Sequence, residues 1–318
     1  MIETHQLTKR FGSFLAVDSI TLTVEPGTIF AILGPNGAGK TTTVRMLTSI
    51  LEPTGGWARV AGFDVVRHPT EVRARVGVLT EQHGLYQRMK AIEYLDFFAQ
   101  LYHLPEDQRR RRPYELMEHF GLGDALEKRL GEYSKGMQQK LALARALLHD
   151  PLVLLLDEPT SAMDPQSARL VREAILALQR AERTIAITTH NLTEAQMLAD
   201  RIAVIRRGRI IAEGTFDSLA RRFVGPPLME LRTANPLNGL ATDLAGMVEV
   251  VDQGDCWLRF HTPNPAVDNP ALLRRLMGLG VEVVTLSEVS RTLEDVYLQI
   301  VREDEGHDRD AGLHPAAD

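Results

Sequence analysis

One short segment near the start of the chain constrains the fold more than any other. Residues 34–41 read GPNGAGKT and match the pattern GxxxxGK[ST]. They follow a continuous apolar run, residues 28–33, and precede a helical pattern that ends near Leu51. A buried strand, a glycine-rich loop and a helix in this order form a cradle in which backbone N–H groups bind phosphate. The segment therefore predicts an α/β domain with a buried parallel strand and a nucleotide phosphate site.

Three side chains at the end of this loop have specific expected roles. Lys40 would neutralise the β- and γ-phosphates of a nucleotide, and the Thr41 hydroxyl would ligate Mg²⁺. Thr42 would add a second hydroxyl at the start of the helix. The other expected binding positions in the loop are Gly34, Asn36, Gly37 and Gly39.

A second motif consists of two adjacent acids at the end of an apolar run. Residues 153–156 read VLLL and are followed by Asp157 and Glu158. A carboxylate at the C-terminal end of a parallel strand lies beside the phosphate loop, where Asp157 could hold Mg²⁺ through water. Glu158 could orient or deprotonate an attacking water. Alone, this motif could equally be a strand that ends in solvated acids, but together with the phosphate loop it indicates catalysis.

Strand-like and helical segments alternate along residues 1–222, which is typical of a parallel sheet covered by helices. A predominantly helical, amphipathic stretch at about 82–145 interrupts them as an inserted subdomain. After Gly225 the order becomes strand, helix, strand, strand, helix, strand, which matches the split βαβ, ferredoxin-like arrangement. We therefore expect a small α+β domain over 225–302. Residues 303–318 are polar and lack periodicity, so we expect a disordered acidic tail.

Composition excludes several classes of protein. A single cysteine, Cys256, rules out an internal disulfide and a cysteine-based zinc site. No apolar run is long enough to span a bilayer, and the N-terminus lacks the apolar core of a secretory signal. The net charge of −6 argues against nucleic-acid binding by bulk charge. That argument is weak, however, because residues 303–318 carry six acids and one arginine and supply most of this charge.

A third motif identifies a family. Residues 133–140 read YSKGMQQK and precede the apolar run LALARALL. This segment resembles the LSGGQ signature of the nucleotide-binding subunits of ATP-binding cassette (ABC) transporters. Ser134 and Gly136 keep their places, whereas Lys135 and Met137 depart from the pattern. The resemblance implies the P-loop ABC ATPase fold, in which Ser134 and Gly136 would contact the γ-phosphate of ATP bound by a second protomer.

Other positions follow the same family pattern in order. Phe11 matches the aromatic residue that stacks on adenine, and His190 matches the histidine that senses the γ-phosphate. Asp164 closes a loop that would contact the opposite protomer. The family's glutamine, which touches Mg²⁺ and the attacking water, aligns best with Glu81. A shift of one residue would give this role to Gln82 instead.

The C-terminal segment RTLEDVYL, from Arg291, is similar to the appended domain of bacterial type-2 exporter ATPases of the sodium-efflux and daunorubicin-resistance kind. This resemblance implies an ATPase that uses ATP and Mg²⁺, forms a homodimer around ATP, and energises a separate transmembrane permease. It would lie on the cytoplasmic face of the membrane and serve export of a drug, an ion or another small molecule. Apolar side chains in residues 91–102 could dock the permease.

Two other functions compete with this interpretation. A soluble ABC ATPase acting on DNA would separate Lys40 from Ser134 by a long coiled coil, and one acting on the ribosome would carry two cassettes. The sequence has neither feature, so we expect no direct nucleic-acid partner. A P-loop kinase would leave both the YSKGM segment and His190 unexplained.

Overall fold

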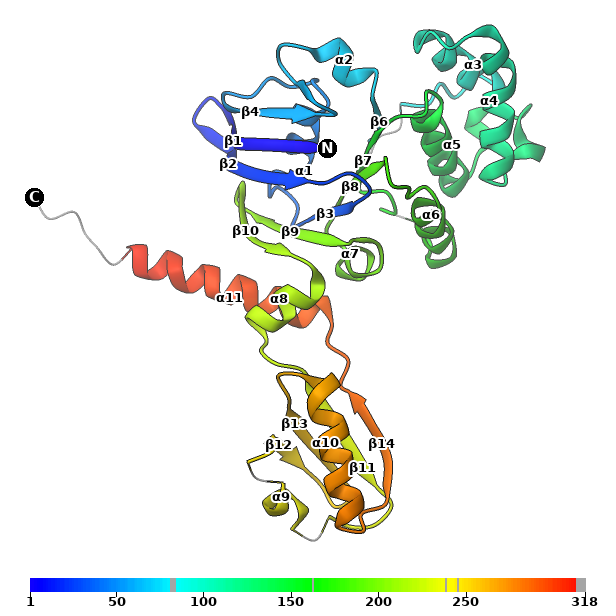
Figure 1. Cartoon of the computed structure of the whole chain (residues 1–318). Coiled ribbons are helices and arrows are strands. Elements are labelled where there is room, and N and C mark those ends of the chain that lie inside the picture. Colours follow the sequence, from blue (N-terminus) through cyan, green and yellow to red (C-terminus); the bar gives the residue numbers. More distant parts are fainter. Residues whose placement is uncertain (81–83, 162, 238, 245, 313–318) are drawn as a thin grey trace, which may run out of the picture. The chain divides into compact units, whose positions relative to one another are not determined.

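The computed structural model describes residues 1–80, 84–161, 163–237, 239–244 and 246–312 (Figure 1). The chain divides into two units, Met1–Thr215 and Phe216–Asp318, and each is described by itself. Within the described residues, no helix is both long and apolar enough to cross a membrane.

The first unit is built around a six-stranded sheet with the order β10-β9-β3-β8-β7-β6. Its pairs are parallel except at the edge, where β10 runs antiparallel to β9. Every residue of β3, β7 and β8 is buried, because strands of a covered parallel sheet are enclosed on both faces. In chain order the strands are β3 (Ile29–Leu33), β6 (Val76–Leu79), β7 (Val153–Asp157), β8 (Thr184–Thr189), β9 (Arg201–Arg206) and β10 (Arg209–Gly214).

A second, antiparallel sheet in the same unit has the order β2-β1-β4-β5. One apolar cluster joins it to the central sheet through helix α1, with Ile2, Leu22, Val44 and Leu155 among its members. The N-terminal strands therefore form one wall beside the phosphate loop. The elements are β1 (Ile2–Phe11), β2 (Phe14–Val24), α1 (Lys40–Leu47), β4 (Gly55–Val60), β5 (Phe63–Asp64) and α2 (Pro69–Arg73).

Helices α3, α4 and α5 form the inserted helical part of the first unit (Figure 1). The Tyr133 hydroxyl, just before α5, donates a hydrogen bond to the carbonyl of Ala125 at 2.7 Å and fixes the approach to α5. Helix α6 follows β7, and α7 follows β8. The bounds are α3 (Ala91–Leu101), α4 (Glu106–His119), α5 (Lys135–Leu147), α6 (Pro165–Ala177) and α7 (Leu192–Leu198), with short 3₁₀ turns at Gly123–Ala125 and Leu130–Glu132.

The second unit contains a four-stranded antiparallel sheet with the order β12-β13-β11-β14. This is the strand order of a split βαβ fold, so the expected small α+β unit is present. Its core includes Leu231, Phe260 and Leu276. The elements are α8 (Phe216–Phe223), β11 (Leu228–Thr233), α9 (Leu240–Asp243), β12 (Glu249–Gln253), β13 (Trp257–His261), α10 (Pro265–Gly278), β14 (Val283–Glu288) and α11 (Leu293–Gly312).

The end of the chain differs from the sequence-based prediction. Helix α11 continues to Gly312, so the prediction of a disordered tail from Glu303 is wrong for residues 303–312. Residues 303–312 are polar and have no apolar period, so an interpretation based on apolar periodicity misses this end of the helix. Residues 313–318 lie outside the described residues. Helix α8 packs against α11 within the second unit, whereas the sequence grouped residues up to 222 with the first domain.

Candidate nucleotide site

The phosphate loop joins β3 to α1 and depends on glycine at two close approaches. A Cβ atom at Gly34 would lie 2.2 Å from the carbonyl oxygen of Ile205. A Cβ at Gly39 would lie 2.6 Å from the carbonyl oxygen of Ala16, and Gly39 also has a φ of +106°. Because larger residues would strain the backbone at both positions, the loop can hold this conformation only with glycine there.

A pocket of about 380 Å³ lies along this loop. Its wall includes eight of the residues predicted to bind or act on a nucleotide, and they come from three separate segments of the first unit. The phosphate loop, the second acid and the histidine are thus brought together. The lining residues are Phe14, Ala16, residues 35–42, Glu158, Ser161 and His190.

Lys40 is buried at the base of the pocket, with 5% of its surface exposed. Its Nζ donates hydrogen bonds to the carbonyl oxygens of Gly34 at 2.7 Å and Pro35 at 3.2 Å. The same atom lies 3.2 Å from Oε1 of Glu158. An ammonium group fixed in this way supplies a localised positive charge beside the backbone cradle, as a phosphate chain requires.

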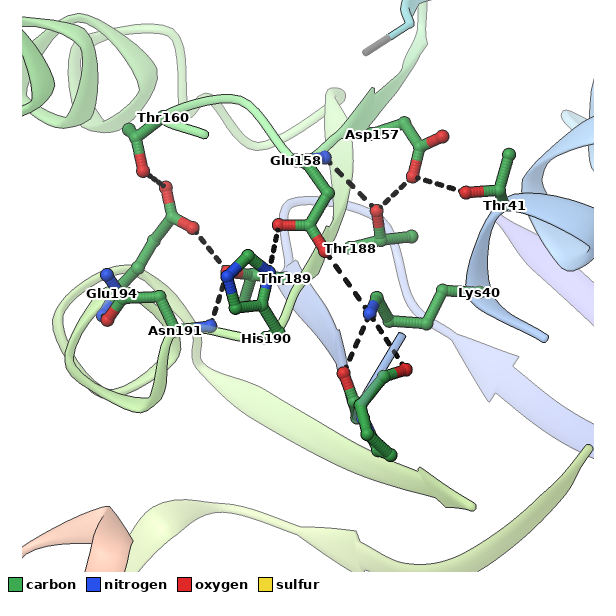
Figure 2. Close-up of polar contacts among 12 residues, drawn as sticks. Lys40, Thr41, Asp157, Glu158, Thr160, Thr188, Thr189, His190, Asn191 and Glu194 are labelled. Carbon is green, nitrogen blue, oxygen red and sulfur yellow. Dashed lines mark hydrogen bonds and ion pairs between the residues drawn. The ribbon is translucent and has the colours of Figure 1, made fainter. Parts of the chain in front are cut away.

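Asp157 lies opposite the phosphate loop at the end of β7, where it accepts two hydroxyl hydrogen bonds (Figure 2). Thr41 Oγ1 donates to Asp157 Oδ1 at 3.3 Å, and Thr188 Oγ1 donates to the same oxygen. One carboxylate and one hydroxyl are hard oxygen donors that suit Mg²⁺, which takes few protein ligands and shares its shell with phosphates and water. The residues present therefore fit this ion. Glu81 and Gln82, the candidates for a further ligand, lie outside the described residues.

Glu158 connects the two sides of the site. Its Oε2 lies 2.8 Å from Nδ1 of His190, while its Oε1 faces Lys40 (Figure 2). Its backbone is in the left-handed region, with φ of 50°, and its N–H donates to the carbonyl oxygen of Thr188 at 3.0 Å. A non-glycine residue keeps such a conformation only when its surroundings hold it there, and this occurs most often at functional sites.

Ser134, Gly136 and Asp164 lie elsewhere. Ser134 caps α5 by accepting a hydrogen bond from the Met137 N–H, and Asp164 caps α6 by accepting one from the Ser167 N–H. Hydrogen bonding from Ser167 lowers the pKa of Asp164 below its usual value. Among the described residues, these three do not line the pocket, although Ser134 and Asp164 are exposed. One copy of the chain therefore does not bring its own α5 N-terminus to its own phosphate loop.

Known proteins resemble this chain over most of its length. Residues 17–161 match the family described as "ABC transporter". The daunorubicin resistance ATP-binding protein DrrA3 of Streptomyces coeruleorubidus is 38% identical over 301 residues, which cover 93% of this chain and 94% of that protein. The chain belongs to the ABC transporter family. The predicted family is thereby confirmed.

Two further comparisons agree with this assignment. The Nod factor export ATP-binding protein I of Cupriavidus metallidurans is 35% identical over 302 residues, 94% of this ABC chain and 97% of that protein. A solved ATP-binding subunit of an ABC transporter is 27% identical with a TM-score of 0.66, and covers 77% of this chain and 99% of its own. The chain is an ABC ATP-binding subunit that hydrolyses ATP, and the predicted fold class is confirmed. These relatives give no support to a role on the ribosome or DNA.

The structure places a different aromatic residue beside the ATP pocket from the one predicted. Phe11 and Phe14 face each other across the β1–β2 turn. Of these two described rings, Phe14 lines the pocket, while Phe11 lies outside it with the Lys9 ammonium 5.2 Å from its ring. Sequence spacing alone does not separate two phenylalanines three residues apart on either side of a turn.

We expect Phe14→Ala to raise the KM for ATP about tenfold, because base–aromatic stacking contributes roughly 1–3 kcal/mol. Phe11→Ala is the matched control, since it removes the same ring from the paired position and is expected to change KM less than about twofold. Steady-state ATPase assays of both variants measure the difference. A larger effect of Phe11→Ala would restore the assignment made from the sequence.

Proposed function

We propose that this chain energises export of a drug, an ion or another small molecule through a separate permease, from the cytoplasmic face of the membrane. The relatives named for daunorubicin resistance and for Nod factor export support the outward direction. The observation that carries the catalytic part of the proposal is the position of Glu158, whose two carboxylate oxygens face Lys40 and His190 in one pocket.

In the proposed reaction, water attacks the γ-phosphorus of ATP and the bond to the β-phosphate oxygen breaks. Glu158 accepts the proton of the attacking water, and His190 orients the Glu158 carboxylate from 2.8 Å away. Lys40 and the loop N–H groups stabilise the charge on the transferred phosphoryl group. Thr41 and Asp157 would hold Mg²⁺, which neutralises phosphate charge.

The proposed active form contains two copies of the chain. The N-terminus of α5, with Ser134 as its cap, is exposed, and Lys135 and the backbone N–H groups of its first turn suit a phosphate. Since this helix end lies away from its own pocket, a second copy would present it to ATP through a self-complementary, two-fold interface. Gly136 and Asp164 would contribute to the same interface.

The permease partner would dock on an exposed apolar patch, which we define as Tyr86, Phe97 and Leu101. These side chains are 52%, 39% and 56% exposed, and the Tyr86 and Phe97 rings lie 6.2 Å apart. Exposed apolar side chains that gather in one patch indicate a protein interaction site. Phe97 and Leu101 are on α3, within residues 91–102 that were predicted to dock the permease, and Tyr86 lies just before this range.

We expect Phe97→Glu to abolish co-purification of the chain with a multi-span membrane protein, while its basal ATPase activity stays near wild type, because Phe97 lies outside the pocket. The control is Leu176→Glu, which places the same charge on an exposed apolar position of α6. Unchanged co-purification of Phe97→Glu would reject the patch as the docking surface. Sedimentation of the wild-type chain with ribosomes would reject the transport role.

A further inference from the structure

A buried acid lies behind the catalytic residues and is not part of the ATP pocket. Glu194 is on α7 and is 1% exposed. Its two carboxylate oxygens accept hydrogen bonds from different threonines: Oε1 from Thr160 at 2.6 Å, and Oε2 from Thr189 at 2.5 Å (Figure 2). Both hydroxyl donors are buried as well. One side chain therefore joins two segments that are far apart in the sequence.

These two segments are the ones that carry the catalytic pair. Thr160 follows Glu158 by two residues, after β7, and Thr189 ends β8 immediately before His190. Strands β7 and β8 are neighbours in the sheet, so both segments leave the same edge. The segments touch through Glu158 and His190 in the pocket and are tied a second time through Glu194 behind it.

Each end of this second tie is itself held in place. The Thr189 hydroxyl accepts a hydrogen bond from the Asn191 N–H at 3.0 Å, and the Asn191 side chain caps α7 by accepting from the Glu194 N–H at 3.1 Å. On the other segment, Gln139 of α5 donates to the carbonyl oxygen of Pro159 at 2.5 Å. The geometry around Glu194 is thus fixed by several short contacts, and a shift of one segment would strain the other.

Burying the Glu194 carboxylate costs free energy that an apolar side chain in the same place would not cost. Burial raises the pKa of Glu194 above its usual value, the hydroxyl groups of Thr160 and Thr189 act in the opposite direction, and the nearby Glu158 carboxylate raises it further. A carboxylate in such a place is stabilised only while both donors point at it, so the network specifies one arrangement of the two segments. An apolar residue could fill the space without specifying that arrangement.

We propose that Glu194 is a positioning residue of the ATPase site, which fixes the segment bearing Glu158 against the segment bearing His190 through Thr160 and Thr189. This inference rests on the proposed roles of Glu158 and His190. It assigns Glu194 no contact with ATP. Since the tie sets the geometry of the proton-accepting pair rather than the phosphate cradle, its loss should affect turnover and leave ATP binding intact.

The test uses the full chain with Thr160→Val and Thr189→Val, which remove each hydroxyl and keep the shape of the side chain. We expect each variant to lower kcat about tenfold, while the KM for ATP changes less than about twofold. Thr160→Ser and Thr189→Ser keep the hydroxyl and are expected to retain wild-type kcat. The matched control is Thr184→Val, at the other end of β8 from Thr189. The buried Thr184 hydroxyl donates to the carbonyl oxygen of Glu25 at 3.0 Å, away from the site.

The double variant Thr160→Val/Thr189→Val separates one network from two independent effects. We expect its kcat to fall little further than that of either single variant, because either change alone releases the tie. The inference would be overturned if the losses in kcat of the two single variants multiplied in the double variant. Wild-type kcat in the valine variants, serine variants no more active than the valine variants, or an equal loss of kcat in Thr184→Val would also overturn it. Glu158→Gln and His190→Ala are measured alongside: normal turnover in those two would instead reject the proposed catalytic roles.

Discussion

Glu158→Gln is expected to lower kcat for ATP hydrolysis about 10²–10⁴-fold, the usual contribution of a general base, while ATP still binds. The substitution keeps the size of the side chain and removes its ability to accept a proton. It also removes the negative charge 3.2 Å from Lys40, which leaves that ammonium fully available to the phosphates. Phosphate release measures turnover, and calorimetry of ATP binding measures affinity.

The same variant should accumulate the state that normally precedes hydrolysis. With ATP and Mg²⁺ we expect Glu158→Gln to elute as a dimer in size-exclusion chromatography, because ATP between two copies joins them until it is cleaved. Glu182→Gln, an identical change at an exposed acid, is the control and should turn over ATP like the wild-type chain. Normal hydrolysis by Glu158→Gln would withdraw its role as the base, and a monomer at saturating ATP would contradict the two-copy arrangement.

The central part of the site could be predicted from sequence because sheet topology brings it together. Lys40 follows β3, and His190 follows β8. Asp157 is the last residue of β7, and Glu158 comes directly after it. These three parallel strands are neighbours, so residues at their carboxyl ends meet at one edge. Strand β3 is a continuous apolar run, β7 is apolar up to Asp157, and β8 has an apolar centre between threonines, and such runs identify a buried parallel strand without knowledge of its partners.

Glu194 shows what the sequence did not reveal. An acid in a helix such as α7 usually belongs to a solvated face, and nothing in its periodicity distinguishes a buried carboxylate from an exposed one. Its two partners are threonines, which are also common in strands and turns for reasons unrelated to function. The contact depends on the side-by-side placement of two segments about thirty residues apart, and only the folded sheet provides that placement.

The residues at the start of α5 pose a different problem, since sequence similarity gives them a role but not a location. In the structure Ser134 caps α5 outside the pocket formed by its own chain. A role in binding ATP therefore requires a second copy. The start of α5 lies against α6, since a Cβ at Gly136 would lie 3.1 Å from Oγ of Ser167 on α6. Asp164 caps α6, so the exposed N-terminal ends of α5 and α6 form one continuous surface.

Ser134→Asp is expected to abolish ATP hydrolysis, with a loss of at least about 10²-fold, because it places a carboxylate where the γ-phosphate would bind. Aspartate caps a helix as well as serine does, so helix α5 and the stability of the chain should be unchanged. Ser134→Asn, which also caps and carries no charge, is the matched control and should retain far more activity. Equal losses in the two variants would show that the hydroxyl itself, rather than the charge at this position, accounts for the effect.

Mixing two inactive variants tests whether Ser134 acts on its own chain or on the partner's ATP. Lys40→Met damages the phosphate loop, and Ser134→Asp damages the signature; each is expected to be inactive alone. In a mixed dimer, one of the two sites combines the intact loop of one copy with the intact signature of the other. Equal mixing yields half mixed dimers with one working site each, so activity should return to about a quarter of wild type. If Ser134 served the pocket of its own chain, every site would keep one defect and no activity would return.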